Sequence, residues 1–203
     1  MTESATTDNT PFEVPPDATP VAKLAQRDGA AVLAALCLFA AADAWYIATD
    51  SAFAALLSLA VGVVVGGAVT RQVHEWGHFT GARFRGGIAP TREISSFFPI
   101  FDFDMKRGDP AAFRAMSVGG NVAHWTLVLL LLLLLPLDTP GQIALAASSF
   151  GYAVYGSSIE LPIIRRAYAG ATPIESFAGF SGEVVKRSRW IGIGAGLLLF
   201  VIL

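Results

Sequence analysis

The stretch LSLAVGVVVGGAVTRQVHEWGH, from Leu57 to His78, joins an apolar run to a spacing of metal ligands. No charged side chain occurs in it before Arg71. An apolar run of this length is typical of a helix that crosses a membrane, and the run begins upstream at about Ala52. We therefore expect a membrane helix over about 52–73 that leads directly into the polar sequence His-Glu-x-x-His.

The composition of the whole chain also indicates a membrane protein. Of the 203 residues, 54% are hydrophobic and 15% are charged, whereas soluble domains carry about 25% charged residues. The net charge of -2 gives no reason to expect a nucleic-acid partner. The single cysteine, Cys37, excludes an internal disulfide and a cysteine-based metal cluster. A histidine site has only His74, His78 and His124 to draw on.

Five apolar segments follow one another along the chain. About 20 helical residues cross a hydrocarbon core of about 30 Å, and the segments cover about 29–47, 52–73, 116–137, 142–164 and 190–203. The last is the shortest, and whether it crosses fully stays open. We predict an all-α membrane protein, a bundle of about five transmembrane helices within residues 23–203. Residues 1–22 lack an apolar period, and we expect them to form a disordered cytoplasmic tail.

The basic residues predict the orientation of this bundle. Of the 14 Lys and Arg residues, Arg71 lies at the end of the second segment, and the others precede the first segment or lie between the second and third or between the fourth and fifth. The opposite loops, near Asp50 and Asp138, contain no basic residue. Because basic residues concentrate in cytoplasmic loops, we expect a multi-pass protein of a bacterial or archaeal inner or plasma membrane, with a cytoplasmic N terminus. His-Glu-x-x-His then lies at the cytoplasmic rim.

The sequence FRGGIAPTREISSFFPIFDFDMKRGDP, residues 84–110, separates the second and third segments. Prolines interrupt it, and its aromatic and β-branched residues are typical of strands. We predict a membrane-associated segment resembling a β-hairpin between these two helices. Asp102 and Asp104 alternate with Phe101 and Phe103, as in a strand with one solvated face. We prefer that interpretation to a metal-binding role for the two aspartates.

The sequence His-Glu-x-x-His has the spacing of a zinc site on one helix face. Residues i and i+4 lie one above the other, so His74 and His78 can bind one Zn²⁺ ion. Glu75 lies beside them as the candidate catalytic residue, a general base that takes a proton from metal-bound water. The alternative is a helix end at which these side chains are merely solvated.

Zinc needs a third protein ligand, and the fourth position is left for water or substrate. Glu160, near the cytoplasmic end of the fourth segment, is our preferred third ligand, because a carboxylate so close to hydrocarbon needs a partner. An ion pair with Arg165 is the alternative for Glu160. His124 and Asn121 are further candidates, either for the third ligand or for a contact to substrate or transition state. We interpret Asp43 as a polar contact between helices or a residue of a water cavity.

Two stretches resemble the site-2 protease family, the intramembrane zinc metalloproteases. VHEWGHFTGARFRG, residues 73–86, resembles the active-site helix of that family, and Gly77, Phe79, Ala82 and Arg83 stand where its pattern expects them. The resemblance of DPAAFRAMSVGGNVAHWTLVLLLLL, residues 109–133, is weaker. There Gly119 to His124 occupy a family motif, and His124 stands in place of an asparagine. The similarity covers roughly residues 61–137.

The chain departs from the family at the third ligand. The family supplies it from a Leu-Asp-Gly-like motif, and Arg166 and Ala167 stand here in place of the Leu and Asp. Glu160 would substitute for that ligand. The resemblance implies a zinc metalloendopeptidase that hydrolyses membrane-spanning substrate proteins near the cytoplasmic face of the lipid bilayer. The alternatives are an inactive relative that binds membrane proteins, and a metal or proton transport protein.

Overall fold

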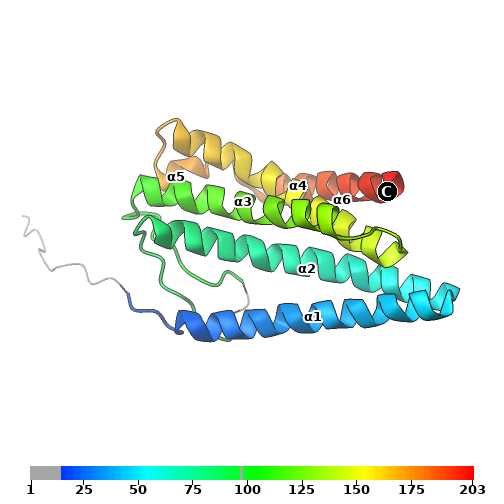
Figure 1. Cartoon of the computed structure of the whole chain (residues 1–203). Helices are drawn as coiled ribbons and strands as arrows, with labels where there is room; N and C mark the ends of the chain where they lie inside the picture. The colour runs from blue at the N-terminus through cyan, green and yellow to red at the C-terminus, as the bar shows by residue number, and fades with distance from the viewer. Residues whose placement is uncertain (1–14, 97) are drawn as a thin grey trace, which may run out of the picture.

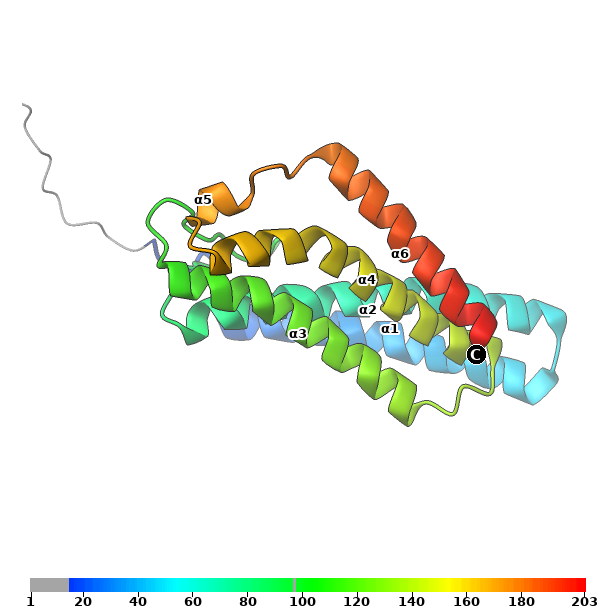
Figure 2. The same cartoon turned by 90° about the horizontal axis from the view of Figure 1, so that it is seen from above.

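The computed structural model describes residues 15–96 and 98–203, and these residues form an all-α protein without strands (Figure 1). Five long helices run beside one another, and a short helix, α5, lies in a connection at one end (Figures 1 and 2). We call the end at which residues 85–109 connect α2 to α3 the site end, and the opposite end the far end. The helices are α1 (Val21–Thr49), α2 (Ala52–Phe84), α3 (Pro110–Leu134), α4 (Pro140–Tyr168), α5 (Pro173–Ser176) and α6 (Gly182–Ile202).

Three helices, α1, α2 and α3, are long and apolar enough to cross a membrane. Each also exposes large apolar side chains, such as Leu33, Phe53 and Leu133, as expected of surfaces that face lipid. The helices α4 and α6 do not share this combination of length and composition within the described residues. α4 packs against α2, α3 and α6 and is rich in glycine, alanine and serine, whereas α6 begins with charged residues. The structure thus supports a membrane protein, and three of the five predicted segments lie in helices suited to crossing.

The backbones of α2 and α3 touch beside the histidines. Gly77 faces Gly119, and a Cβ atom on either glycine would collide with the carbonyl oxygen of the other. Small residues of this kind allow membrane helices to approach closely. Gly120 lies directly against the imidazole rings of His74 and His78. The glycines therefore bring side chains of α3 within reach of the His-Glu-x-x-His residues.

The described residues between α2 and α3, 85–96 and 98–109, are irregular, so the predicted β-hairpin is not supported. The loop does reverse direction, and it contains one isolated antiparallel bridge, between Thr91 and Phe101. The backbone N–H of Arg92 donates to the carbonyl of Ile100 over 2.9 Å. The N–H of Asp102 donates to the carbonyl of Pro90 on the other side of the bridge, at 2.9 Å. Pro90 has no N–H to return that bond, so the ladder is incomplete there.

The two aspartates of this loop have local partners. Asp102 forms an ion pair with Arg92, at 2.6 Å. Asp104 closes a turn by accepting hydrogen bonds from the backbone N–H groups of Lys106 and Arg107, each at 2.9 Å. The bond from Arg107, followed by that from Lys106, holds the pKa of the Asp104 carboxyl below its usual value.

The segment before α1 binds the same loop. The N–H of Ala18 donates to the carbonyl of Thr91, at 3.1 Å. The carboxylate of Asp17 accepts from the N–H of Thr91, at 2.9 Å, and pairs with Arg83. Most of the tail predicted for residues 1–22 lies outside the described residues, but residues 15–20 pack on the loop and α1 begins at Val21.

A buried carboxylate, Asp28, ties α1 to α2. Asp28 is 4% exposed and accepts a hydrogen bond of 2.8 Å from the indole Nε1 of Trp76, a residue of the motif HEWGH. Arg27 donates to Asp28, at 2.7 Å, and to the loop carbonyls of Ile94 and Ser96, at 2.5 and 2.8 Å. The start of α1 therefore holds both the motif helix and the loop.

A second buried carboxylate, Asp43, connects three elements at the far end. It accepts hydrogen bonds from Ser58 of α2, at 2.7 Å, from Thr139 before α4, at 2.6 Å, and from Gln142 of α4, at 3.1 Å. These bonds confirm the interpretation of Asp43 as a polar contact between helices.

Candidate metal centre

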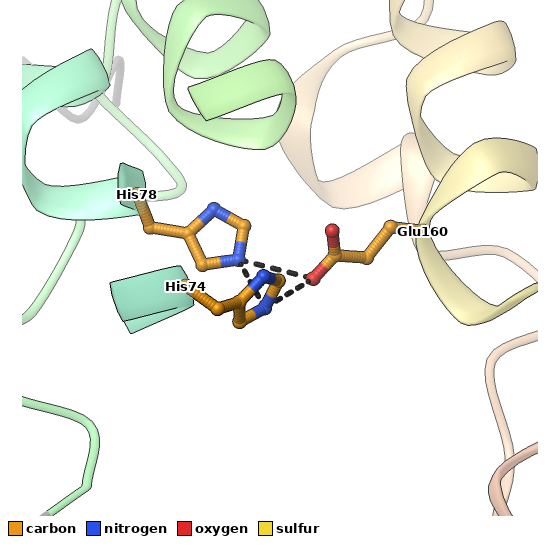
Figure 3. Close-up of side chains that lie close together, drawn as sticks. All are labelled: His74, His78 and Glu160. Carbon is orange, nitrogen blue, oxygen red and sulfur yellow. Dashed lines mark hydrogen bonds and ion pairs between the residues drawn. The ribbon is translucent and has the colours of Figure 1, made fainter. Parts of the chain in front are cut away.

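His74, His78 and Glu160 converge inside the bundle near its site end (Figure 3). The two histidines lie one turn apart on α2, and Glu160 reaches them from α4. The Nε2 atoms of the histidines are 3.0 Å apart, and each lies 3.0 Å from Oε1 of Glu160. His74 is buried, whereas His78 and Glu160 are half-buried. Three potential ligand atoms thus form a triangle with equal sides.

The size of this triangle fits a small divalent cation. In a tetrahedral zinc site with bonds of about 2.0–2.2 Å, the ligand atoms lie about 3.3 Å apart. The observed 3.0 Å differs from this spacing by a few tenths of an ångström, which small side-chain rotations can supply. Two imidazole nitrogens and one carboxylate oxygen are also a donor set that catalytic zinc sites use. The residues therefore fit zinc in both geometry and chemistry.

The second ring nitrogens of the two histidines have partners outside the triangle. Nδ1 of His78 lies 2.8 Å from the carbonyl oxygen of Met116, and Nδ1 of His74 lies 2.9 Å from Nδ1 of His124. A carbonyl only accepts, so His78 carries a proton on Nδ1, and in the neutral ring that a metal requires the lone pair is on Nε2, the atom that belongs to the triangle. Such bonds fix the orientation of histidines that bind metals.

The other two candidate ligands, His124 and Asn121, lie next to residues of the triangle but outside it. His124 is fully buried on α3, and its ring stacks on that of His74 with centroids 5.0 Å apart. Asn121, one turn earlier, donates from Nδ2 to Oε2 of Glu160, at 2.5 Å. Each therefore contacts a residue of the triangle and has no atom in the triangle itself.

Glu75 occupies the neighbouring position on α2 and is half-buried. It follows His74 directly in the sequence. The ring of Tyr152 also packs edge-on against that of His74, with centroids 5.8 Å apart. A carboxylate, a phenol and the candidate ligands therefore share one region of the bundle.

An apolar cavity of about 330 Å³ adjoins this region between α2, α4 and α6. Tyr152 belongs to its lining and also touches His74, so this side chain connects the wall of the cavity to the triangle. The remaining lining consists mainly of small or apolar residues, among them Gly67, Ala147, Gly192 and Gly196.

Sequence reasoning missed several residues of the site. Ser157 contacts Asn121, His124 and Trp125, and Tyr152 contacts the rings of His74 and His124. Ser157 lies three residues before Glu160, hence on the same face of α4, and this spacing could have identified it. Trp125 and Tyr152 carry no comparable signal, because tryptophan and tyrosine in membrane helices commonly serve as interfacial anchors.

Comparisons with protein-family models, with curated proteins and with solved structures found no match to this chain. The function must therefore be inferred from the geometry and chemistry of the site.

Proposed function

We propose that this chain is an intramembrane zinc metalloprotease, similar to the site-2 protease family, that hydrolyses peptide bonds of membrane-spanning proteins near the cytoplasmic face. The observation that carries the proposal is the convergence of His74, His78 and Glu160 at mutual distances of 3.0 Å. Glu75 follows His74 directly, as the motif of zinc peptidases requires. The position of the three ligands within an apolar bundle favours a substrate that lies in the membrane.

The proposed topology has five crossings, with α4 and α6 added to the three most apolar helices. α4 is surrounded by α2, α3 and α6, and its small residues serve packing, which lowers its mean hydropathy without preventing insertion. The distribution of the 14 basic residues then puts the N terminus and the site end at the cytoplasmic face.

Each residue of the site has a role in this chemistry. His74, His78 and Glu160 hold the metal and leave one coordination position to water or to the substrate carbonyl. Zinc, when bound, lowers the pKa of water and polarises a carbonyl group. Glu75 accepts a proton from the attacking water and delivers it to the amine that leaves.

Cleavage by the purified full chain tests this function. The protein is reconstituted in liposomes with a panel of tagged single-span membrane proteins, and products are identified by mass spectrometry. We expect zinc-dependent cleavage that is lost in Glu75→Gln, a variant that keeps its metal because Glu75 is not a ligand. Normal binding of the panel without any product, in a fully zinc-loaded wild type, would favour the inactive relative instead.

A further inference from the structure

We propose that Asn121, His124 and Ser157 form one hydrogen-bonded chain that orients two of the ligands, His74 and Glu160, and that none of the three binds the metal itself. They are positioning residues in this proposal. The proposal rests on the metal centre of the proposed function and not on proteolysis.

The chain of hydrogen bonds begins at one ligand and ends at another. From Oε2 of Glu160 it runs to Nδ2 of Asn121, at 2.5 Å, and from Oδ1 of Asn121 to the hydroxyl of Ser157, at 2.7 Å. It continues from Ser157 to Nε2 of His124, at 3.3 Å, and from Nδ1 of His124 to Nδ1 of His74, at 2.9 Å. The side chains alternate between α4, α3, α4, α3 and α2. The chain thus ties together the three helices that build the centre.

The carboxylate of Glu160 sets the direction of the first two bonds. An ionised carboxylate only accepts, so Asn121 must present its NH₂ group to Glu160 and its carbonyl oxygen to Ser157. That carbonyl oxygen also only accepts, so Ser157 must donate its single hydroxyl proton to Asn121. The hydroxyl can then only accept from its other neighbours.

The indole of Trp125 agrees with this direction. Its Nε1–H is a donor only, and it lies 2.9 Å from the hydroxyl oxygen of Ser157. The remaining contact of Ser157 is to Nε2 of His124, which must therefore carry a proton. A neutral imidazole has one proton, so Nδ1 of His124 holds a lone pair and accepts from Nδ1–H of His74.

The last bond determines the state of the ligand. With its proton on Nδ1, a neutral ring of His74 has its lone pair on Nε2, the atom that lies 3.0 Å from Nε2 of His78 and from Oε1 of Glu160. Met116 sets the same state for His78 independently. Two imidazole lone pairs and one carboxylate oxygen therefore meet within 3.0 Å of one another. This convergence of acceptors is stable only around a cation or shared protons.

The same bonds exclude His124 as a ligand. Both of its ring nitrogens are engaged, one as a donor to Ser157 and one as an acceptor from His74. Its contact is also with the Nδ1 side of His74, whereas the triangle lies on the Nε2 side. Gly156 provides room for this arrangement, since a Cβ atom there would lie 3.3 Å from Cε1 of His124.

Zinc affinity of the purified full chain tests the proposal by competition with a chromophoric chelator. Partners that orient metal ligands typically contribute about 10–100-fold to affinity, and we expect Ser157→Ala to weaken zinc binding by about this factor. Ser149→Ala is the matched control, because Ser149 is also a buried serine of α4 whose hydroxyl donates to α2, at the carbonyl of Gly66. The control should stay within about two-fold of wild type. Asn121→Leu interrupts the chain at another bond and should reproduce the loss if Ser157→Ala does not fold.

X-ray absorption of the zinc-loaded protein separates positioning from ligation. We expect two imidazole ligands in wild type and an unchanged two in His124→Phe, with weaker binding in that variant. Three imidazoles in wild type, or unaltered affinity in both Ser157→Ala and Asn121→Leu, would overturn the proposal while leaving the protease hypothesis intact. A wild-type chain that binds no zinc would overturn the metal centre and this proposal together, whereas zinc binding without cleavage would contradict proteolysis alone.

Discussion

Nε2 of His78 lies 3.0 Å from Oε1 of Glu160, although 82 residues separate them in the sequence. The contact joins the motif helix α2 to α4 and supplies a third potential ligand to a motif that provides only two. A complete set of three ligands therefore depends on the packing of α2 against α4.

Removal of the carboxylate should abolish tight metal binding. We expect the zinc affinity of Glu160→Gln to fall by more than the roughly 100-fold that the loss of an orienting residue costs. An amide oxygen is a far weaker ligand than a carboxylate. Elemental analysis after dialysis against a chelator measures this loss. Glu175→Gln is the control, since Glu175 is exposed and caps α5 away from the triangle. Retention of stoichiometric zinc by Glu160→Gln would show that another residue completes the site.

The close contact of α2 with α3 should be as necessary for zinc binding as the ligands themselves. We expect Gly77→Ala to force the two backbones apart, because its Cβ atom would collide with the carbonyl of Gly119. Both thermal stability in detergent and zinc content should fall. Gly67→Ala, on the same helix, meets nothing within 4 Å and should leave both unchanged. Equal behaviour of the two variants would mean that the helices separate without cost.

Part of this site could be predicted from the sequence, and part depends on how the helices pack. The spacing of His74 and His78 predicts a shared helix face, and a carboxylate near hydrocarbon needs a partner, so Glu160 was accessible to sequence reasoning. The interhelical contacts of Ser157 and Tyr152 depend on how α4 packs, which no local pattern encodes. The predicted hairpin is not supported for a local reason, because Pro90 has no N–H to complete the ladder beside the one bridge among the described residues. The first helix begins earlier than its apolar run, at Val21, because the polar residues Arg27 and Asp28 bind the loop and Trp76.

The bond between Asp28 and Trp76 should contribute to stability and not to ligation. Trp76→Phe leaves Oδ2 of buried Asp28 without its indole donor, and an unsatisfied buried acceptor costs about 1–3 kcal/mol. We expect a lower unfolding temperature in detergent, with zinc stoichiometry unchanged. Trp190→Phe is the control, because Trp190 is 65% exposed. Loss of zinc from folded Trp76→Phe would assign the start of α1 a direct part in shaping the site.

The far-end carboxylate provides a comparison within the same fold. Asp43→Leu removes the shared acceptor of Ser58, Thr139 and Gln142, so we expect destabilisation of about 1–3 kcal/mol or more, because several donors lose their partner. Zinc affinity should stay near that of wild type, since the centre lies at the other end of α2. Thermal unfolding and the chelator competition, measured on one preparation, separate the two effects. A parallel loss of affinity would instead indicate that packing at the far end controls the position of Glu160.

Cysteine accessibility tests whether α4 crosses the membrane. In a Cys37→Ser background, Asp138→Cys and Ala178→Cys put single exposed thiols in the connections before and after α4. If basic residues mark the cytoplasmic face, a membrane-impermeant maleimide added to intact cells should label only Asp138→Cys. Inverted vesicles should give the opposite pattern. Labelling of both thiols from the same side would contradict a crossing by α4. Glu160, the residue that completes the triangle, is carried by α4. If α4 did not cross, Glu160 would not meet His74 and His78 inside the bilayer.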